Sequence, residues 1–360
     1  MKSYDWDNLS PEDLVSLLEN EDEKIYDEMI RRAYAVKVEH VGKIVYFRGI
    51  IEFSNICSKN CLYCGIRRDS REVHRFCLDT DEIISCARWI YENNYGSMVL
   101  QSGERKDPEF TEFVTDLVKK IKEIGNGSLG VTLSLGEQDR ETYEKWFKAG
   151  AHRYLLRIET TARDLYKQLH PQDHSFDERL KCLNHLREIG YQTGTGVMIG
   201  LPGQTPKHLA GDIQFFKDND IDMIGMGPYV VHKGTPLAQI ADNSDEARDK
   251  RFSLAIKMVA LTRLYLKDIN IAATTALQAL NPVGREMALL AGANIIMPIV
   301  TPLSHRKDYQ LYDGKPCIDD LPDNCRNCLE GRINSIGETI GYTQWGDSPH
   351  YARKNKAEQI

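Results

Sequence analysis

The stretch Cys57-Ser58-Lys59-Asn60-Cys61-Leu62-Tyr63-Cys64-Gly65 places three thiols at the spacing C-x3-C-x2-C. Three cysteine thiolates can bind three of the four irons of a cubane cluster, which leaves the fourth iron for a ligand from outside the protein. A structural zinc site normally takes four protein ligands in two close pairs, and no second pair lies near this loop. The alternative, three buried structural cysteines, is disfavoured by this spacing. The stretch therefore predicts an iron–sulfur site that binds a further small molecule.

A repeating strand–helix pattern begins at residue 44, just before the cysteine loop, and predicts the fold. The candidate strands are short, apolar and rich in β-branched residues: Ile44–Ile51, Ser97–Gln101, Gly130–Leu135, Arg153–Ile158, Thr193–Ile199, Met223–Tyr229, Ile271–Leu277 and Ile295–Val300. The helical segments between them include Asp81–Tyr95, Asp107–Ile124, Asp139–Lys148, Asp177–Glu188, Thr205–Asn219 and Asp245–Leu266. Eight such units predict an α/β protein with a complete (β/α)8 barrel. The alternative is an open, six-stranded partial barrel with a separate C-terminal domain.

The pattern divides the chain into three parts. We expect an N-terminal helical segment at 1–43, the barrel at 44–303 and a C-terminal extension at 304–360. In the first part, Ser10-Pro11-Glu12-Asp13 has the N-cap, proline and acidic first turn of a helix start. In a parallel barrel the active site lies at the carboxyl ends of the strands, so the cysteine loop, which follows the first strand, is expected there.

Composition and charge exclude several classes of function. The net charge of −7 and a pI near 5.9 disfavour a surface for nucleic acid or for an anionic membrane. No apolar run approaches the length of a membrane span. Nine cysteines in 360 residues do not form the dense framework of a small secreted protein. We therefore expect a cytoplasmic protein, in an anaerobic setting because oxygen damages exposed iron–sulfur clusters.

Polar residues at other strand ends are expected to meet the cysteine loop. After the second strand, Gln101-Ser102-Gly103 combines hydrogen-bonding groups with a glycine that permits close approach of the backbone. Thr132, in the third strand, either binds a ligand or fills a layer of the barrel. The fourth strand carries Arg157 and Glu159, and the next helix carries Arg179. A carboxylate beside guanidiniums suits a zwitterionic ligand, and the alternative is an ordinary ion pair.

Two further features lie outside these strand ends. Arg48 lies within the first strand, and if it points inward it requires an anionic partner, such as a substrate carboxylate or cyanide. An outward Arg48 that keeps its charge in water is the alternative. Near the C-terminus, Cys317-x7-Cys325-x2-Cys328 supplies three more thiols. These three residues, called here the C-terminal cysteines, predict a second iron–sulfur cluster, a zinc ion with an outside ligand, or an empty relic.

The chain resembles the radical S-adenosylmethionine (SAM) enzymes and, among them, the HydE family of FeFe-hydrogenase maturases. The resemblance covers roughly residues 40–330. It rests on these stretches: Ile50-Ile-Glu-Phe-Ser-Asn55, Cys57–Arg68, Val99-Leu-Gln-Ser-Gly-Glu104, Val131-Thr-Leu-Ser-Leu-Gly-Glu137, Arg153-Tyr-Leu-Leu-Arg157, Gly200-Leu-Pro-Gly-Gln-Thr205, Met258-Val-Ala-Leu-Thr-Arg263, Ala273-Thr-Thr-Ala276 and Met297-Pro298. The spacing of the C-terminal cysteines separates this family from the related biotin and methylornithine synthases. One departure is Ile158, where the resemblance leads us to expect histidine before Glu159.

The resemblance implies a radical SAM barrel with a 4Fe–4S cluster on Cys57, Cys61 and Cys64, and an optional second cluster on the C-terminal cysteines. It implies reductive cleavage of SAM to a 5′-deoxyadenosyl radical. The residues implied to contact SAM or to lie near it are Tyr63, Gln101, Ser102, Gly103, Thr132, Arg157, Glu159, Arg179 and Met223. Those implied to line a substrate cavity are Arg48, Thr274, Thr275 and Tyr309.

The resemblance also implies the substrate and the partners. The substrate would be an iron–cysteine complex carrying CO and cyanide, attacked at sulfur, and the partners would be other hydrogenase maturases and a flavodoxin- or ferredoxin-type electron donor. Two alternatives stay open. One is a radical SAM mutase or sulfur-inserting enzyme for an amino-acid-like substrate, and the other is a non-catalytic iron–sulfur carrier. A carrier has no need of Glu159 and Arg179 beside a SAM site, which disfavours it.

Overall fold

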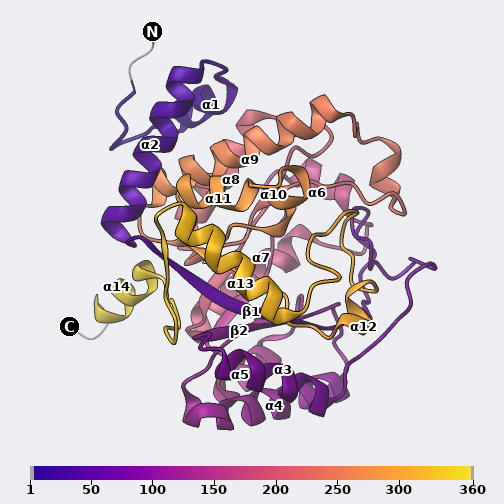
Figure 1. Ribbon diagram of the computed structural model, residues 1–360. Helices are drawn as coiled ribbons and strands as arrows, with labels where there is room; N and C mark the ends of the chain where they lie inside the picture. The colour runs from indigo at the N-terminus through magenta and orange to yellow at the C-terminus, as the bar shows by residue number, and fades with distance from the viewer. Residues whose placement is uncertain (1–3, 358–360) are drawn as a thin grey trace.

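The computed structural model describes residues 4–357 and builds them around one parallel sheet (Figure 1). The strands are β1 (Ile44–Ser54), β2 (Ser97–Ser102), β3 (Gly130–Ser134), β4 (Arg153–Leu155), β5 (Gln192–Thr195), β6 (Met198–Ile199), β7 (Met223–Ile224), β8 (Gly227–Pro228), β9 (Asn270–Ile271), β10 (Ile295–Ile296) and β11 (Thr339–Ile340). The main sheet runs in the order β10-β1-β2-β3-β4-β5-β7-β9, while β11 pairs with β1, and β6 pairs with β8 in a small second sheet.

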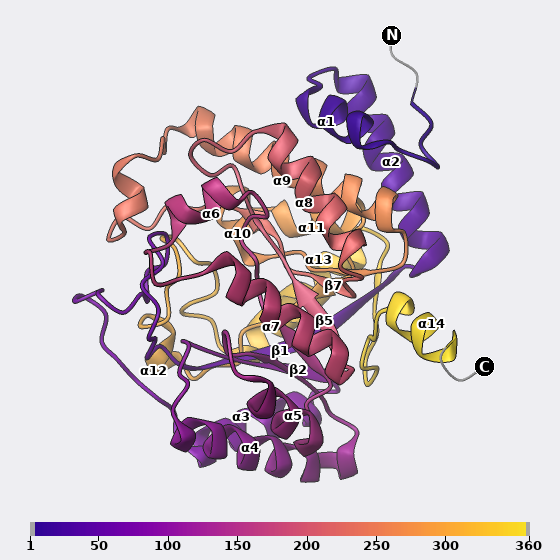
Figure 2. The ribbon, with the colours of Figure 1, turned by 180° about the vertical axis from the view of Figure 1, so that it is seen from behind.

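Helices cover the outer face of this sheet (Figures 1 and 2). They are α1 (Pro11–Glu19), α2 (Glu23–His40), α3 (Thr80–Glu92), α4 (Pro108–Glu123), α5 (Arg140–Ala149), α6 (Arg163–Leu169), α7 (Phe176–Ile189), α8 (Pro206–Asp218), α9 (Asp245–Leu266), α10 (Thr275–Leu280), α11 (Gly284–Leu290), α12 (Leu303–Arg306), α13 (Pro322–Ser335) and α14 (Pro349–Ala357). None of the helices in the described part is long and apolar enough to cross a membrane.

Local sequence signals account for most helix starts. Ser10 caps α1 through its side chain, and Asp13 returns the bond to the backbone of Ser10, as the capping box predicts. Asp107 and Asp139 cap α4 and α5 in the same way through their carboxylates, and Thr205 caps α8. The helices predicted for the N-terminal segment are present, and they pack outside the barrel, α1 on α8 and α2 on α9.

The prediction of a complete barrel is wrong, because the sheet is an incomplete, half-barrel type of structure. Its end strands β9 and β10 are joined by a single isolated bridge, between Ala272 and Ile295, and not by a ladder of paired residues. Both strands are only two residues long. The segment predicted to continue the seventh strand instead turns at Thr274 into α10, whose sequence Thr-Ala-Leu-Gln-Ala-Leu favours a helix. The chain therefore leaves the sheet before the seam can form.

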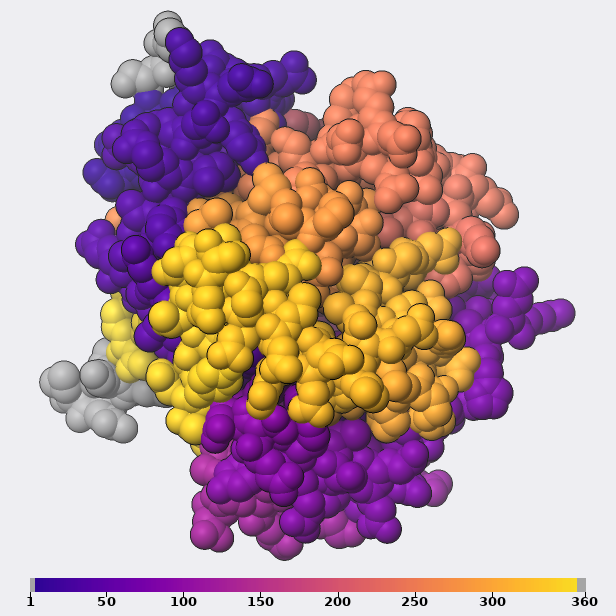
Figure 3. Space-filling view, in the orientation of Figure 1, coloured from indigo at the N-terminus to yellow at the C-terminus, as the bar shows by residue number. Residues whose placement is uncertain are grey.

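The alternative of a separate C-terminal domain is also not what the structure shows. β11 adds to the main sheet beside β1, and α13 packs on β11. Figure 3 shows the C-terminal part of the chain, in orange and yellow, lying across one face of the molecule over the earlier segments. Residues 304–360 are therefore integrated with the barrel in the described part of the chain.

Candidate active site

The cysteine loop follows β1 and forms part of the wall of a cavity of about 360 Å³. Cys57, Cys61 and Cys64 are free thiols that line this cavity. Burial raises the pKa of each thiol, that of Cys61 to about 12, so a bound cation is needed to hold them as thiolates. Among residues 4–357, no three His, Cys, Asp or Glu side chains are grouped so that they could hold one metal ion. Three thiols spread around one cavity instead suit a cubane, which takes one thiolate on each of three irons.

Backbone hydrogen bonds fix the cysteine loop from several sides. Leu62 N–H donates to the carbonyl of Leu169 at 2.9 Å, and Gly65 N–H donates to that of Leu311 at 3.1 Å. The backbone N–H of Glu104 donates to Sγ of Cys57 at 3.3 Å. A side chain at Gly103 would place its Cβ 2.4 Å from the carbonyl oxygen of Ile56, so glycine is required for this approach. The loop is therefore held in place independently of any metal.

Tyr63 packs against a histidine that sequence reasoning did not identify. Its hydroxyl lies 3.4 Å from Nε2 of His170, and the two rings meet edge to face. Nδ1 of His170 donates to the carbonyl of Tyr166 at 2.9 Å, which leaves Nε2 of the neutral ring to accept from Tyr63. Burial lowers the pKa of His170 to about 3, so the ring is neutral. This contact orients the Tyr63 ring in the cavity wall.

Arg157 and Glu159, beyond the carboxyl end of β4, form an ion pair with each other, the arrangement that the sequence left open as the alternative to a site for a zwitterionic ligand. Nε and Nη2 of Arg157 donate to one carboxylate oxygen of Glu159 at 3.1 and 2.9 Å. Glu159 has a left-handed backbone, with φ of +66°, and exchanges backbone hydrogen bonds with Gly196 and Met198 on the neighbouring segment. Both side chains line the cavity. A charged pair here presents the two groups that a zwitterionic ligand requires.

Arg179 lines the same cavity but is engaged by a carboxylate that sequence reasoning missed. Its Nε donates to Oε1 of the buried Glu137 at 2.6 Å, and Lys59 donates to the other oxygen at 2.7 Å. Glu104 accepts from the backbone N–H of Glu137 and lies 3.5 Å from Lys59. Glu104 and Glu137 directly follow strand-end motifs, and that position was the signal that could have identified them.

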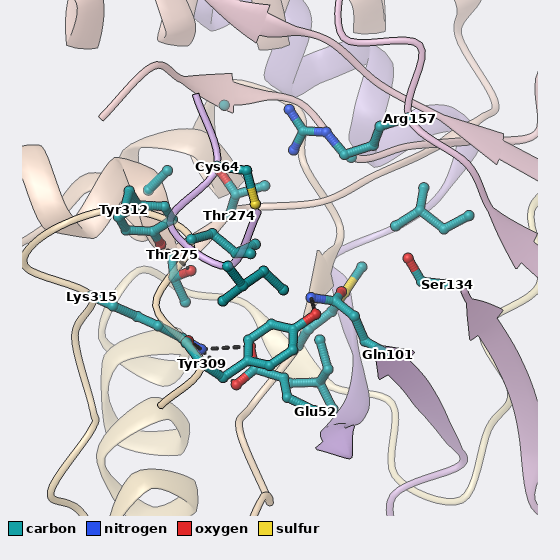
Figure 4. Close-up of a pocket in the computed structure, with 18 of the residues that line it drawn as sticks. Glu52, Cys64, Gln101, Ser134, Arg157, Thr274, Thr275, Tyr309, Tyr312 and Lys315 are labelled. Carbon is teal, nitrogen blue, oxygen red and sulfur yellow. Dashed lines mark hydrogen bonds and ion pairs between the residues drawn. The ribbon is translucent and has the colours of Figure 1, made fainter. Parts of the chain in front are cut away.

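The opposite wall of the cavity comes from the C-terminal part of the chain (Figure 4). Tyr309 accepts a hydrogen bond from Nε2 of Gln101 at 3.2 Å, and the hydroxyls of Thr275 and Tyr312 lie 2.7 Å apart. The hydroxyl of Thr274 donates to the carbonyl of Met226. Two further predicted residues, Ser102 and Gly103, also line the cavity.

Three predicted site residues lie elsewhere. Arg48, Thr132 and Met223 line a second, much smaller cavity of about 10 Å³. Each lies in the first half or the middle of its strand, whereas the main cavity opens at the strand ends. The two cavities share the wall residues Leu155, Gly225, Ala272 and Met297. The sequence pattern gave the correct face of the strands for Arg48 and Thr132, but not the depth in the barrel.

Arg48 is buried, as one reading of the sequence predicts, but in the described part of the chain it forms no ion pair with a carboxylate. Its guanidinium donates to Sδ of Met223 and to the carbonyl of Gly346, both at 3.0 Å. Burial and the nearby Arg153 hold the pKa of Arg48 well below its usual range, and Asp347 opposes that shift. The expected anionic partner is therefore replaced by neutral acceptors and a more distant carboxylate.

The C-terminal cysteines divide between the cavity and the surface. Cys317 and Cys325 line the cavity, whereas Cys328 is exposed. A hydrogen bond from Cys325 and the nearby Arg285 lower the pKa of the Cys317 thiol, and burial opposes this shift. Two of these cysteines therefore lie close to one another beside a cationic side chain.

Comparison with known proteins gives the family. The model of the radical SAM superfamily matches residues 51–216. The chain is 46% identical over 334 residues to the FeFe hydrogenase maturase subunit HydE of Thermotoga maritima, covering 92% of each protein. It is 27% identical over 306 residues to the 3-methylornithine synthase of Methanosarcina acetivorans, covering 85% of this chain and 83% of that protein.

Solved structures agree on the fold. The crystal structure of methylornithine synthase superposes with a TM-score of 0.79 at 25% identity, covering 93% of this chain and 95% of the other. That of HydG, a maturase of the FeFe-hydrogenase, superposes with a TM-score of 0.78 at 21% identity, covering 98% of this chain and 78% of the other. The thiol loop, the charged strand ends and the extent of the similarity to HydE together show that this chain is a radical SAM enzyme of the HydE family.

Proposed function

We propose that this enzyme cleaves SAM reductively and acts in FeFe-hydrogenase maturation on an iron–cysteine complex that carries CO and cyanide. The observation that carries the proposal is the convergence of three free thiols and the Arg157–Glu159 pair on one cavity. The 46% identity to a hydrogenase maturase, over 92% of both chains, supports the choice of pathway. The other maturases and a flavodoxin- or ferredoxin-type electron donor are its proposed partners.

Each side chain then has a role. Cys57, Cys61 and Cys64 hold a 4Fe–4S cluster, which when bound supplies the electron that breaks a C–S bond of SAM. Arg157 and Glu159 are assigned to the charged methionyl end of SAM, and Arg179, which donates to the carbonyl of Arg157, supplies a second guanidinium beside them. Tyr63, held by His170, contacts the adenine.

Six further site residues line the cavity: we assign Gln101, Ser102 and Gly103 to SAM, and Thr274, Thr275 and Tyr309 to the substrate. Gln101 donates a hydrogen bond to Tyr309, so the two groups adjoin. The C-terminal cysteines hold an optional second cluster. The proximity of Cys317 and Cys325 and the cationic Arg285 support that assignment.

The test is an anaerobic assay of the iron-loaded protein with SAM and dithionite. Products are quantified with and without the iron–cysteine complex made by the partner maturase. SAM cleavage that rises with the complex supports the maturase function, and an adenosyl group bonded to the cysteine sulfur, seen by mass spectrometry, supports attack at sulfur. Cleavage that ignores the complex but rises with an amino acid would point to a mutase or sulfur-inserting enzyme. A fully loaded cluster that cleaves no SAM would refute the proposal and favour an iron–sulfur carrier.

A further inference from the structure

The cavity contains a second acid–base pair that neither the cluster nor SAM accounts for. Glu52 and Lys315 line the cavity on the side of Tyr309, whereas Arg157 lies across it (Figure 4). Cys64 and apolar side chains such as Ile50 and Leu155 also line the cavity. The cavity lining therefore carries this ion pair in addition to the Arg157–Glu159 pair and to the charged groups Lys59, Glu104, Arg179 and Arg285.

The geometry of this pair is close and buried. Nζ of Lys315 lies 2.5 and 2.6 Å from the two carboxylate oxygens of Glu52, and each residue is less than a tenth exposed. Nζ also donates to the carbonyl of Tyr309 at 3.3 Å. Burial raises the pKa of Glu52, and the adjacent ammonium opposes this shift. Each charged group therefore has the other as its buried counter-ion.

The position of Glu52 follows from the period of β1. Side chains alternate along a strand, so Arg48, Ile50 and Glu52 share the inward face. Glu52 is the member nearest the strand end, and its backbone N–H donates to the hydroxyl of Thr301 at 2.8 Å. Its carboxylate is therefore fixed by a rigid element, whereas Lys315 comes from a loop and has a long, flexible side chain.

We propose that Glu52 and Lys315 bind the α-ammonium and the α-carboxylate of an amino-acid unit in the substrate. This inference rests on the proposed function, because it takes the cavity to receive a substrate that contains an amino acid. An α-amino acid carries one positive and one negative group on the same carbon atom. It can enter between the two side chains and replace one internal ion pair by two, with no change in the net charge of the cavity.

The contacts around Lys315 make this exchange feasible. When the ammonium leaves Glu52, the carbonyl of Tyr309 remains as an acceptor. The segment that carries Lys315 stays attached before that residue, through Tyr309 to Gln101 and through Tyr312 to Thr275, and after it, where the carbonyl of Cys317 accepts from Arg306 at 3.0 Å. The ion pair is thus not needed to hold this wall in place, which is the role that a purely structural pair would have.

The first experiment needs no variant. Binding to the cluster-loaded, SAM-saturated protein is measured anaerobically by calorimetry, without reductant, for three probes. S-methyl-L-cysteine carries both charged groups, 2-(methylthio)ethylamine lacks the carboxylate, and 3-(methylthio)propanoate lacks the ammonium. We expect each truncated probe to bind at least about tenfold more weakly than S-methyl-L-cysteine, since each loses a charge-assisted contact. Equal affinities, or no binding of S-methyl-L-cysteine, would overturn the inference.

Variants then assign the contacts to residues. Glu52→Gln should weaken binding of S-methyl-L-cysteine and of the amine, whereas Lys315→Gln should weaken binding of S-methyl-L-cysteine and of the carboxylate. The matched control is Lys307→Gln, which removes an exposed lysine paired with Asp319 in the same C-terminal segment and should leave all three affinities unchanged. Variants that melt at a lower temperature but bind the probes as the wild type does would show that the pair is only structural.

Failure of this inference can be distinguished from failure of the proposed function, because the binding measurement requires no turnover of SAM. A protein that cleaves SAM in response to the iron–cysteine complex but does not discriminate among the probes would overturn the inference alone. A protein that discriminates among the probes but cleaves no SAM would overturn the proposed function and leave the amino-acid site standing.

Discussion

Replacement of Glu137 by glutamine tests the electrostatic network behind the cysteine loop. The carboxylate of Glu137 is 1% exposed and receives Arg179 at 2.6 Å and Lys59 at 2.7 Å. Burial alone would raise the pKa of Glu137, but these two cations outweigh burial and lower it from 4.5 to about 2. Because each tenfold change in proton affinity corresponds to about 1.4 kcal/mol, the shift is worth roughly 3 kcal/mol of stability at neutral pH. Glu137→Gln leaves two buried cations facing a neutral amide, a change that typically costs about 3–5 kcal/mol.

The assay is anaerobic denaturant unfolding of the cluster-loaded protein and its variant at neutral pH. We expect a loss of roughly 3 kcal/mol for Glu137→Gln. The control is Glu188→Gln, because Glu188 also pairs with an arginine but its side chain is 54% exposed. That change should cost less than about 1 kcal/mol. A loss below about 1 kcal/mol for Glu137→Gln, or one equal to the control, would refute the view that this network holds the site together.

The lowered pKa of Glu137 also predicts how the stability of the protein changes with pH. The pKa of Glu137 is lower in the folded protein than in the unfolded chain. The ionised carboxylate therefore contributes its full share to the free energy of unfolding when the pH is above the pKa of the unfolded chain, 4.5. That contribution is lost as the pH falls from 4.5 toward about 2. The difference in stability between wild type and Glu137→Gln should therefore shrink over that range. This comparison is made on the full-length protein without iron, since acid destroys the cluster. A difference that grows as the pH falls would contradict the assignment.

Three further changes test other parts of the site. Cys61→Ala should abolish SAM cleavage, measured as 5′-deoxyadenosine, because two thiolates cannot replace three on the cluster, and intact cleavage would remove the mechanism. Simultaneous change of the C-terminal cysteines to alanine should leave most SAM cleavage intact, and its loss in a correctly folded protein would show that these residues serve the first cluster. Burial raises the pKa of Asp212 from 3.8 to about 7, despite its hydrogen bonds from Thr161. The wild type therefore loses stability as the pH rises from 3.8 to about 7, whereas Asp212→Asn does not. Over that range the variant should gain up to about 4 kcal/mol relative to the wild type. A pH-independent difference in thermal unfolding would contradict that assignment.

The part of the fold that could be predicted from sequence is the part determined by local patterns. The helix start at Ser10 is predicted by residues 10–13 alone, because the N-cap side chain and the backbone N–H that it binds lie three residues apart. The closure of the barrel could not be predicted in this way, because it depends on how Ala272 and Ile295 meet across the seam. The apolar run at 271–277 fitted a strand and a helix equally well, and after Thr274 the helical preference of Ala-Leu-Gln-Ala-Leu prevails.

In the candidate site, too, local sequence patterns predict some features, while others depend on how distant segments of the chain meet. The positions of Cys57, Arg157 and Glu159 at strand ends follow from the βα alternation, and the structure brings them to one cavity. Periodicity gives the face of a strand but not the height along the barrel axis, and Arg48 and Met223, which the resemblance implies near the substrate and SAM, line the smaller cavity. Height is set by the stagger between neighbouring strands, a property that one strand's sequence does not contain.

The contact between Glu52 and Lys315 joins residues 263 positions apart and places the C-terminal segment in the catalytic cavity. Tyr309, Tyr312, Lys315 and Cys317 all line that cavity from this one segment. The barrel strands supply the cysteine loop and the Arg157–Glu159 pair, features expected of any radical SAM enzyme that binds the same cofactor. Much of the wall that faces them is built by residues beyond β10 (Ile295–Ile296), the strand of the main sheet's path that comes last along the chain. Substrate choice in this enzyme is therefore expected to depend more on residues 309–317 than on the strand ends, and exchange of that segment between relatives should change the substrate while retaining SAM cleavage.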